Sequence, residues 1–384
     1  MNKKFLCIII FLITIVIQHK TYATNLTTDM INEQQKNFGI SEFIEEANKY
    51  KGDFFEDVNL SEMLNSAIKG KINNSTILKK ILELFAKEIL STIKTLAGIL
   101  VVVLIHSIIK TIADNLETSN ISAIIYYAQY ILIVTILMNN FSSILSTITN
   151  TINNLVGFMN TLIPLLMTLM IYTGSITTSG LLQPIILFVI EFIGNFIVTL
   201  VLPVISIITA LAIISKISDK VQITKLTSFM KSSIVWVLSV VLTIFIGVLS
   251  LEGTLTSSVD GITAKTAKAA VSSIIPVVGK ILGDSVDSVL GCGLVLKNAL
   301  GVVGVVVIIG ICILPIIKLA TLSIMYSITS AIIEPLADTK IVKLLEEFSG
   351  IFKLLLAVLC SVSVLLIIGT TLVVKISNSG MMYR

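Results

Sequence analysis

The chain contains very few of the residues that bind metals or act as nucleophiles in common enzymes. Two histidines, His19 and His106, and four cysteines occur among 384 residues. The cysteines are isolated, sit mostly at or inside apolar stretches, and form no Cys-x-x-Cys pair: Cys7, Cys292, Cys312 and Cys360. A Ser-His-Asp triad or a histidine-rich metal site would have to rest on His106 alone. The sequence therefore predicts no catalytic, metal or cofactor-binding residues, and no enzymatic activity.

Charged residues are equally scarce, at 13% of the chain against about 25% in soluble proteins. Hydrophobic residues make up 55% of the chain, and the mean hydropathy is +1.00. This composition predicts an all-α polytopic membrane protein, because open sheets cannot satisfy their backbone polar groups in lipid. The net charge of +4 is small, and no basic patch with interleaved aromatic residues occurs, so a nucleic-acid partner is not expected.

The N-terminus, residues 1–23, has the layout of a signal peptide. Lys3 and Lys4 precede an apolar core, Phe5–Ile17, and Ala23 is the expected last residue of the leader. The core is shorter than the roughly 20 residues of a membrane span, although an uncleaved anchor is the alternative. Either reading places the following segment outside the cytoplasm.

Residues 24–88 form the one sizeable polar region and are predicted to hold short extracytoplasmic amphipathic helices. One pattern has Ile40, Phe43 and Ala47 on one face. A second begins at Leu60, where Asn59 and Glu62 have the spacing of a capping box. Both helices are expected to pack on the membrane domain or on a partner.

Two membrane segments, 89–251 and 294–384, are predicted to hold roughly six to eight spanning helices. The individual apolar stretches are Ile89–Ile109, Ile121–Phe141, Leu155–Thr173, Leu181–Ile214, Ile234–Leu251, Leu294–Ile317 and Leu354–Val374, with Leu319–Ile333 as a weaker candidate.

The stretch Leu181–Ile214 is too long for one ordinary span and short for two. The loop after it is rich in lysine, which indicates a cytoplasmic position. With Pro184 and Pro203 inside the stretch, we expect a tight hairpin that returns to its starting side. One long tilted helix is the alternative, and would reverse every later segment. With the hairpin, residues 252–293 lie outside the cytoplasm.

Glu191 and Asn195 form a candidate polar site inside this stretch, one helical turn apart. A carboxylate in a span is costly in lipid, so it should face the bundle interior, a water path or a partner. A proton or ion relay would use it chemically. A hydrogen-bonded structural role is the alternative, since no second buried charge is near in sequence.

Residues 252–293 are predicted to form an amphipathic helix pair on either side of Pro276, which cannot continue the first helix. The glycines that follow, Gly291, Gly293, Gly301, Gly304 and Gly310, lack the spacing of a phosphate-binding loop and allow close helix packing, within the chain or between chains. Lys297, at the start of the next span, is expected to extend toward the membrane surface.

Several motifs in this central stretch resemble the stage III sporulation protein AE family of endospore-forming bacteria. They are Asp260-Gly261-Ile262-Thr263, Thr266-Ala267-Lys268, Ile275-Pro276-Val277-Val278-Gly279, Asp284-Ser285-Val286-Asp287 and Leu296-Lys297-Asn298 followed by Gly301. A candidate assembly surface is placed on these motifs, at Asp260, Gly261, Pro276, Gly279, Asp284, Asp287, Lys297 and Asn298.

The resemblance implies a multi-pass component of a secretion-like channel in the mother-cell membrane facing the forespore, needed for forespore development. The partners it implies are an ATPase, other membrane proteins and ring-forming proteins of the same sporulation complex, within the lipid bilayer. A homo-oligomer is left open. The alternative function is a stand-alone secondary transporter of the plasma membrane, which Glu191 and the prolines inside spans would favour.

Overall fold

The computed structural model describes residues 38–50, 59–68, 74–114, 119–217, 223–274 and 278–382. Side chains are described in these ranges except at 74–81, 95, 106, 110–114, 119–123, 125, 251–274, 278–289 and 376–382. The predicted signal peptide, residues 1–23, lies outside the described residues.

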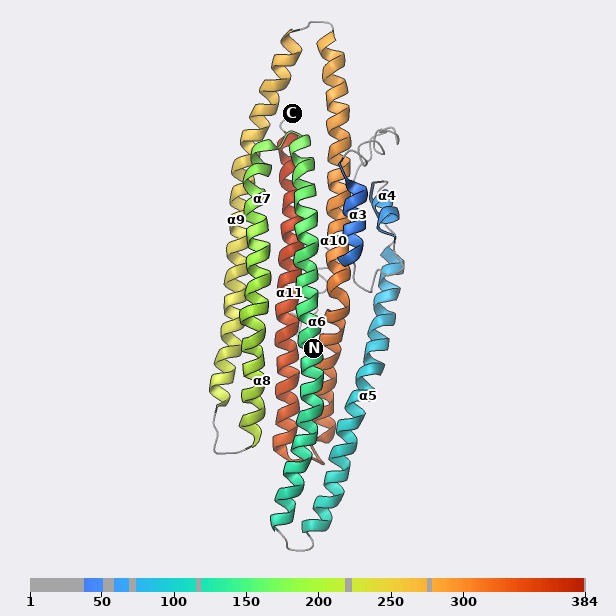
Figure 1. The fold of residues 1–384 in the computed structure, drawn as a ribbon, viewed down its shortest axis with the longest axis vertical. Coiled ribbons are helices and arrows are strands. Elements are labelled where there is room, and N and C mark those ends of the chain that lie inside the picture. Colours follow the sequence, from blue (N-terminus) through green and yellow to red (C-terminus); the bar gives the residue numbers. More distant parts are fainter. Residues whose placement is uncertain are drawn as a thin grey trace.

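Every element of the described part of the chain is a helix, and the helices run side by side along one long axis (Figure 1). Two short helices, α3 (Ile40–Tyr50) and α4 (Leu60–Ile68), come first. The long elements follow: α5 (Asn74–Asp114), α6 (Ser119–Tyr172), α7 (Ile176–Phe196) with α8 (Leu202–Ile217), α9 (Thr224–Ile274), α10 (Val278–Ile333) and α11 (Thr339–Met382).

Six helical runs in this part of the chain are long and apolar enough to cross a membrane, which confirms the predicted all-α membrane fold. Two pairs of predicted spans are single helices. Ile121–Phe141 and Leu155–Thr173 belong to α6, and Leu294–Ile317 and Leu319–Ile333 belong to α10. With 54 residues, α6 is about 80 Å long, against about 30 Å for the hydrocarbon core of a bilayer.

The polar middle of α6, which separated the two predicted spans, is continuous helix, and several of its hydroxyl groups bond to carbonyls of the same helix. The Oγ1 atoms of Thr147 and Thr151 donate to the carbonyls of Ser143 and Thr147, at 2.9 and 2.7 Å. Such bonds let a helix carry threonine in an apolar environment without an external partner.

The predicted hairpin at Leu181–Ile214 is wrong. Residues Ile176–Ile217 form one continuous rod, in which a π-helical turn, Ile197–Val201, joins α7 to α8. The backbone amide of Leu202 bonds to the carbonyl of Ile197, five residues back, directly before Pro203. The wider turn accommodates a proline that has no amide hydrogen, so the chain continues where the sequence suggested a reversal.

The six rods alternate in direction, so their connections fall at two ends of the molecule (Figure 1). The C-terminal end of α8 and the start of α9 lie at the same end as the α10–α11 connection. The α6–α7 connection and the facing ends of α9 and α10 lie toward the other end (Figure 1). The sequence interpretation counted α6 as two crossings where the structure has one, and the next stretch as a returning hairpin where the structure has one crossing. These two errors cancel in the predicted side of every later segment. The lysine-rich loop after α8 is therefore on the side opposite α3 and α4 in both schemes.

The predicted amphipathic pair at 252–293 continues the helices on either side of it. Its first half is the end of α9 and its second half the start of α10, and both extend beyond the ends of the other helices (Figure 1). The two segments thus lie along the axis of the molecule as the tip of a long hairpin.

The short helices α3 and α4 bury the faces that the sequence predicts. Ile40, Phe43 and Ala47 of α3 pack against α6, and Leu60 of α4 is buried toward α10. The predicted cap is present, because the Oδ1 atom of Asn59 accepts a hydrogen bond of 2.9 Å from the amide of Ser61.

The core is shared by α6, α10 and α11, which together carry most of the buried apolar side chains of the described residues. Tyr326 of α10 is completely buried and accepts a hydrogen bond of 2.7 Å from the Nδ2 atom of Asn140 on α6. Lys231 of α9 and Glu347 of α11 form an ion pair of 2.6 Å. These polar contacts fix the relative levels of four helices.

Candidate functional site

Glu191 lies on the outer face of α7, where its side chain is exposed. The Nδ2 atom of Asn160, on α6, donates a hydrogen bond of 2.5 Å to its Oε1 atom. Asn195, one turn further along α7, is also exposed, and its carbonyl accepts a bond of 2.6 Å from Thr199. The structure therefore pairs Glu191 with Asn160, and both residues of the predicted site face outward from the bundle.

Asn160 is the member of this site that the sequence interpretation missed. It lies 31 residues before Glu191, on a different helix, so no local pattern joins the two. The available signal was the density of asparagine along 139–160, which is unusual for a segment of this length and hydropathy.

The surroundings of Glu191 support a hydrogen-bonded structural role more than a relay. A relay needs a second titratable group within reach, and the described side chains offer Glu191 a neutral amide. The outward orientation also removes the main observation that favoured a stand-alone transporter, whose ion site would lie inside the bundle.

Lys297 differs from its prediction, because its side chain is completely buried and does not extend to the membrane surface. Its Nζ atom donates a hydrogen bond of 3.2 Å to the carbonyl of Val374 on α11. Nearby, Asn298 is half-buried. Lys297 thus joins two helices of its own chain, and its side chain is not available to a partner at an assembly surface.

The other residues of the candidate assembly surface stay a prediction. Asp260 and Gly261 lie in the last part of α9, and Gly279, Asp284 and Asp287 lie in the first turns of α10. Their side chains fall outside the described set, as does Pro276 altogether. The end of α9 and the start of α10 form the tip of a hairpin (Figure 1).

Three glycines of the Gly-rich run pack against other helices of the same chain. A Cβ atom on Gly304 would lie 2.5 Å from the Cδ2 atom of Leu162 on α6, and one on Gly301 would overlap Val374 of α11. On Gly293, it would lie 2.8 Å from the Tyr172 ring. The sequence left open whether these glycines allow close helix packing within the chain or between chains. At these three positions they pack within the chain.

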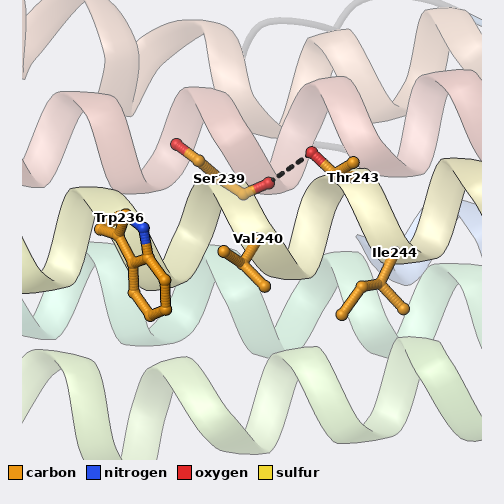
Figure 2. A pocket seen from close by; sticks show the side chains of 5 residues that line it. All are labelled: Trp236, Ser239, Val240, Thr243 and Ile244. Atoms are coloured by element: carbon orange, nitrogen blue, oxygen red, sulfur yellow. Dashed lines mark hydrogen bonds between the residues drawn. The ribbon is translucent and has the colours of Figure 1, made fainter.

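A shallow pocket on the outer face of α9 offers little to a ligand (Figure 2). Its five lining residues, Trp236, Ser239, Val240, Thr243 and Ile244, all come from this helix. Both hydroxyls already bond to carbonyls of their own helix, Ser239 to Val235 and Thr243 to Ser239, each at 2.8 Å. With Trp236 67% exposed, this face suits contact with lipid.

Within the described residues, no three His, Cys, Asp or Glu side chains gather in a way that could hold a metal ion.

Comparison with known proteins gives a specific result. The family model described as stage III sporulation protein AE matches residues 58–377. A stage III sporulation protein AE from Bacillus subtilis (strain 168) is 29% identical over 307 residues, covering 80% of this chain and 77% of that protein. No solved structure matches.

Proposed function

The chain belongs to the stage III sporulation protein AE family, and we propose that it is an integral component of a secretion-like channel complex connecting mother cell and forespore. Within that proposal, the protein sits in the mother-cell membrane facing the forespore and is needed for forespore development. It acts by assembly with an ATPase and with other membrane and ring-forming proteins of the same complex.

The observation that carries the proposal is the extent of the family match. Residues 58–377 include all six helical runs that are long enough to span a membrane, from Leu82 to Lys375. The whole membrane bundle, and not one short motif, is thus the unit shared with a sporulation family.

The polar groups of the described residues support a structural role in an assembly. Those buried inside the bundle pair largely with other groups of the bundle, and the hydroxyls that line the pocket on α9 already bond to their own helix. No enzymatic step is part of the proposed function.

An epitope tag at the C-terminus, followed through sporulation in the native organism, tests the proposal. We expect the protein only after asymmetric division, at the membrane around the forespore, and we expect mild detergent to extract it together with other membrane proteins. Expression in growing cells, evenly around the membrane and without attached proteins, would contradict a channel component. It would make a plasma-membrane transporter the better hypothesis.

A further inference from the structure

Helix α6 carries two rows of residues with the same spacing on nearly opposite faces. The first row is apolar and completely buried in the bundle, and includes Leu137, Phe141, Ile144 and Ile148. The second is exposed and polar: Asn139, Ser143, Ser146, Asn150 and Asn153. We call the second row the polar seam. Both rows alternate steps of four and three residues, the spacing by which helices pack in coiled coils.

The upper end of the polar seam is already a packing surface in this chain. The same spacing continues to Gly157 and Asn160. A Cβ atom on Gly157 would lie 2.6 Å from the ring of Tyr50 on α3, and Asn160 bonds to Glu191 of α7. The row is therefore covered by α3 and α7 at Gly157 and Asn160. The five residues of the polar seam, which precede Gly157 in the chain, are exposed.

Along the long axis of the molecule, the exposed polar seam lies beside an apolar stretch of α10. Asn140, next to the seam, bonds to Tyr326, and Leu162, beyond its upper end, packs on Gly304. The stretch of α10 between these two contacts, residues 304–326, has a single charged residue, Lys318. The seam therefore crosses the part of the protein that the membrane surrounds.

Lipid is a poor environment for the seam. A serine or threonine can donate to a carbonyl of its own helix, but an asparagine amide has two N–H donors and a carbonyl acceptor to satisfy. In the described part of the chain, no hydrogen bond reaches the side chains of Asn139, Asn150 or Asn153. Amides in this position associate helices within membranes.

From this geometry we infer that the polar seam is the contact surface for the α6 helix of a second copy of this chain. The seam is uncharged, and each amide both donates and accepts, so the row is complementary to itself. Two copies inserted in one membrane have the same orientation, so a twofold axis brings their α6 helices together in parallel. Each seam residue then meets its own counterpart, with Asn150 opposite Asn150 near the centre, where a paired asparagine also fixes the register.

Cysteine cross-linking of the full-length protein in membrane vesicles tests this inference. The four native cysteines are replaced by alanine, and a single cysteine is introduced by Asn150→Cys. The matched control is Leu200→Cys. Leu200 is exposed and apolar, and lies nine residues past Glu191 on the antiparallel rod, close to the level of Asn150. Under mild oxidation we expect the Asn150→Cys protein to become a covalent dimer of twice the mass, and the control to stay monomeric.

A second measurement removes the amide without adding a cysteine. Asn150→Leu keeps the side chain's size and should weaken association by roughly 3- to 30-fold, as expected for one lost hydrogen bond between membrane helices. The monomer–dimer equilibrium is followed by energy transfer between labelled copies as lipid is added. Leu200→Ala, the control on the rod of α7 and α8, should leave that equilibrium unchanged.

Several results would overturn the inference. They are equal cross-linking of both cysteine variants, no cross-linking of the Asn150→Cys protein, or a cross-linked product whose mass is not twice that of the chain. Ready labelling of that cysteine by a water-soluble thiol reagent would also overturn it, because it would indicate a water-filled lumen. The vesicles come from a bacterium that makes no spores. The channel proposal and the seam proposal can therefore fail separately.

Discussion

Lys231 and Glu347 form the one ion pair between long helices that the described side chains contain, and it offers a test at the scale of a residue. Their side chains are 24% and 23% exposed, which places the pair between a surface bridge and a buried one. Lys231→Met leaves the carboxylate without its cation, so we expect a loss of about 1–2 kcal/mol in stability after allowing for solvent screening.

The measurement is the apparent melting temperature of the purified protein in mild detergent. Glu347→Lys alone should lower it as well, because two like charges then face each other. The exchanged pair, Lys231→Glu with Glu347→Lys, should recover most of the loss. If the double variant is no more stable than the single ones, the ion pair does not join α9 to α11 in solution.

At the scale of a helix, the packing of α10 against α6 depends on Gly304. Gly304→Leu places a branched side chain where Leu162 already lies, and we expect a destabilisation of about 1–3 kcal/mol from overpacking. The control is Gly247→Leu on α9, where an added Cβ atom meets nothing within 4 Å. That variant should melt at or slightly above the wild-type temperature, because leucine favours a helix more than glycine.

Both variants are compared by thermal unfolding in the same detergent. Equal melting temperatures for the two leucine variants would show that the α6–α10 contact is looser than the structure has it.

The helices themselves were predictable from the sequence, whereas their lengths were not. The apolar faces of α3 and α4 and the cap at Asn59 followed directly from local spacing. The continuity of α6 and of the α7–α8 rod did not. A window of about 20 residues ends at polar or proline residues, but threonine bonds back to its own helix and a π-helical turn accommodates Pro203. Partners on different helices, such as Asn160 for Glu191, require the tertiary structure.

At the scale of the whole molecule, the alternation of six rods makes a definite prediction of sidedness. Residues near the α6–α7 turn should lie outside the cytoplasm, and residues near the α10–α11 turn inside, because the lysine-rich loop after α8 shares the latter end. Ile176 and Thr339 are both exposed and mark the two ends.

Single cysteines at these positions, Ile176→Cys and Thr339→Cys, are treated in intact cells with a membrane-impermeant thiol reagent. We expect labelling of the first alone, and of both after the membrane is opened. The reverse pattern would invert the orientation of every helix, and labelling of both in intact cells would require a different number of crossings.

The tip of the α9–α10 hairpin has a consequence for distance between apposed bilayers. Gly293 packs on Tyr172, the last residue of α6, so the fifteen residues of α10 from Val278 to Cys292 extend, with the end of α9, beyond α6. At 1.5 Å per residue, this projection measures roughly 20 Å. A facing membrane within that range could be touched by this chain directly, whereas a wider gap would have to be bridged by other proteins. The number of α10 residues that precede Gly293 therefore sets the width of the gap that this chain could span.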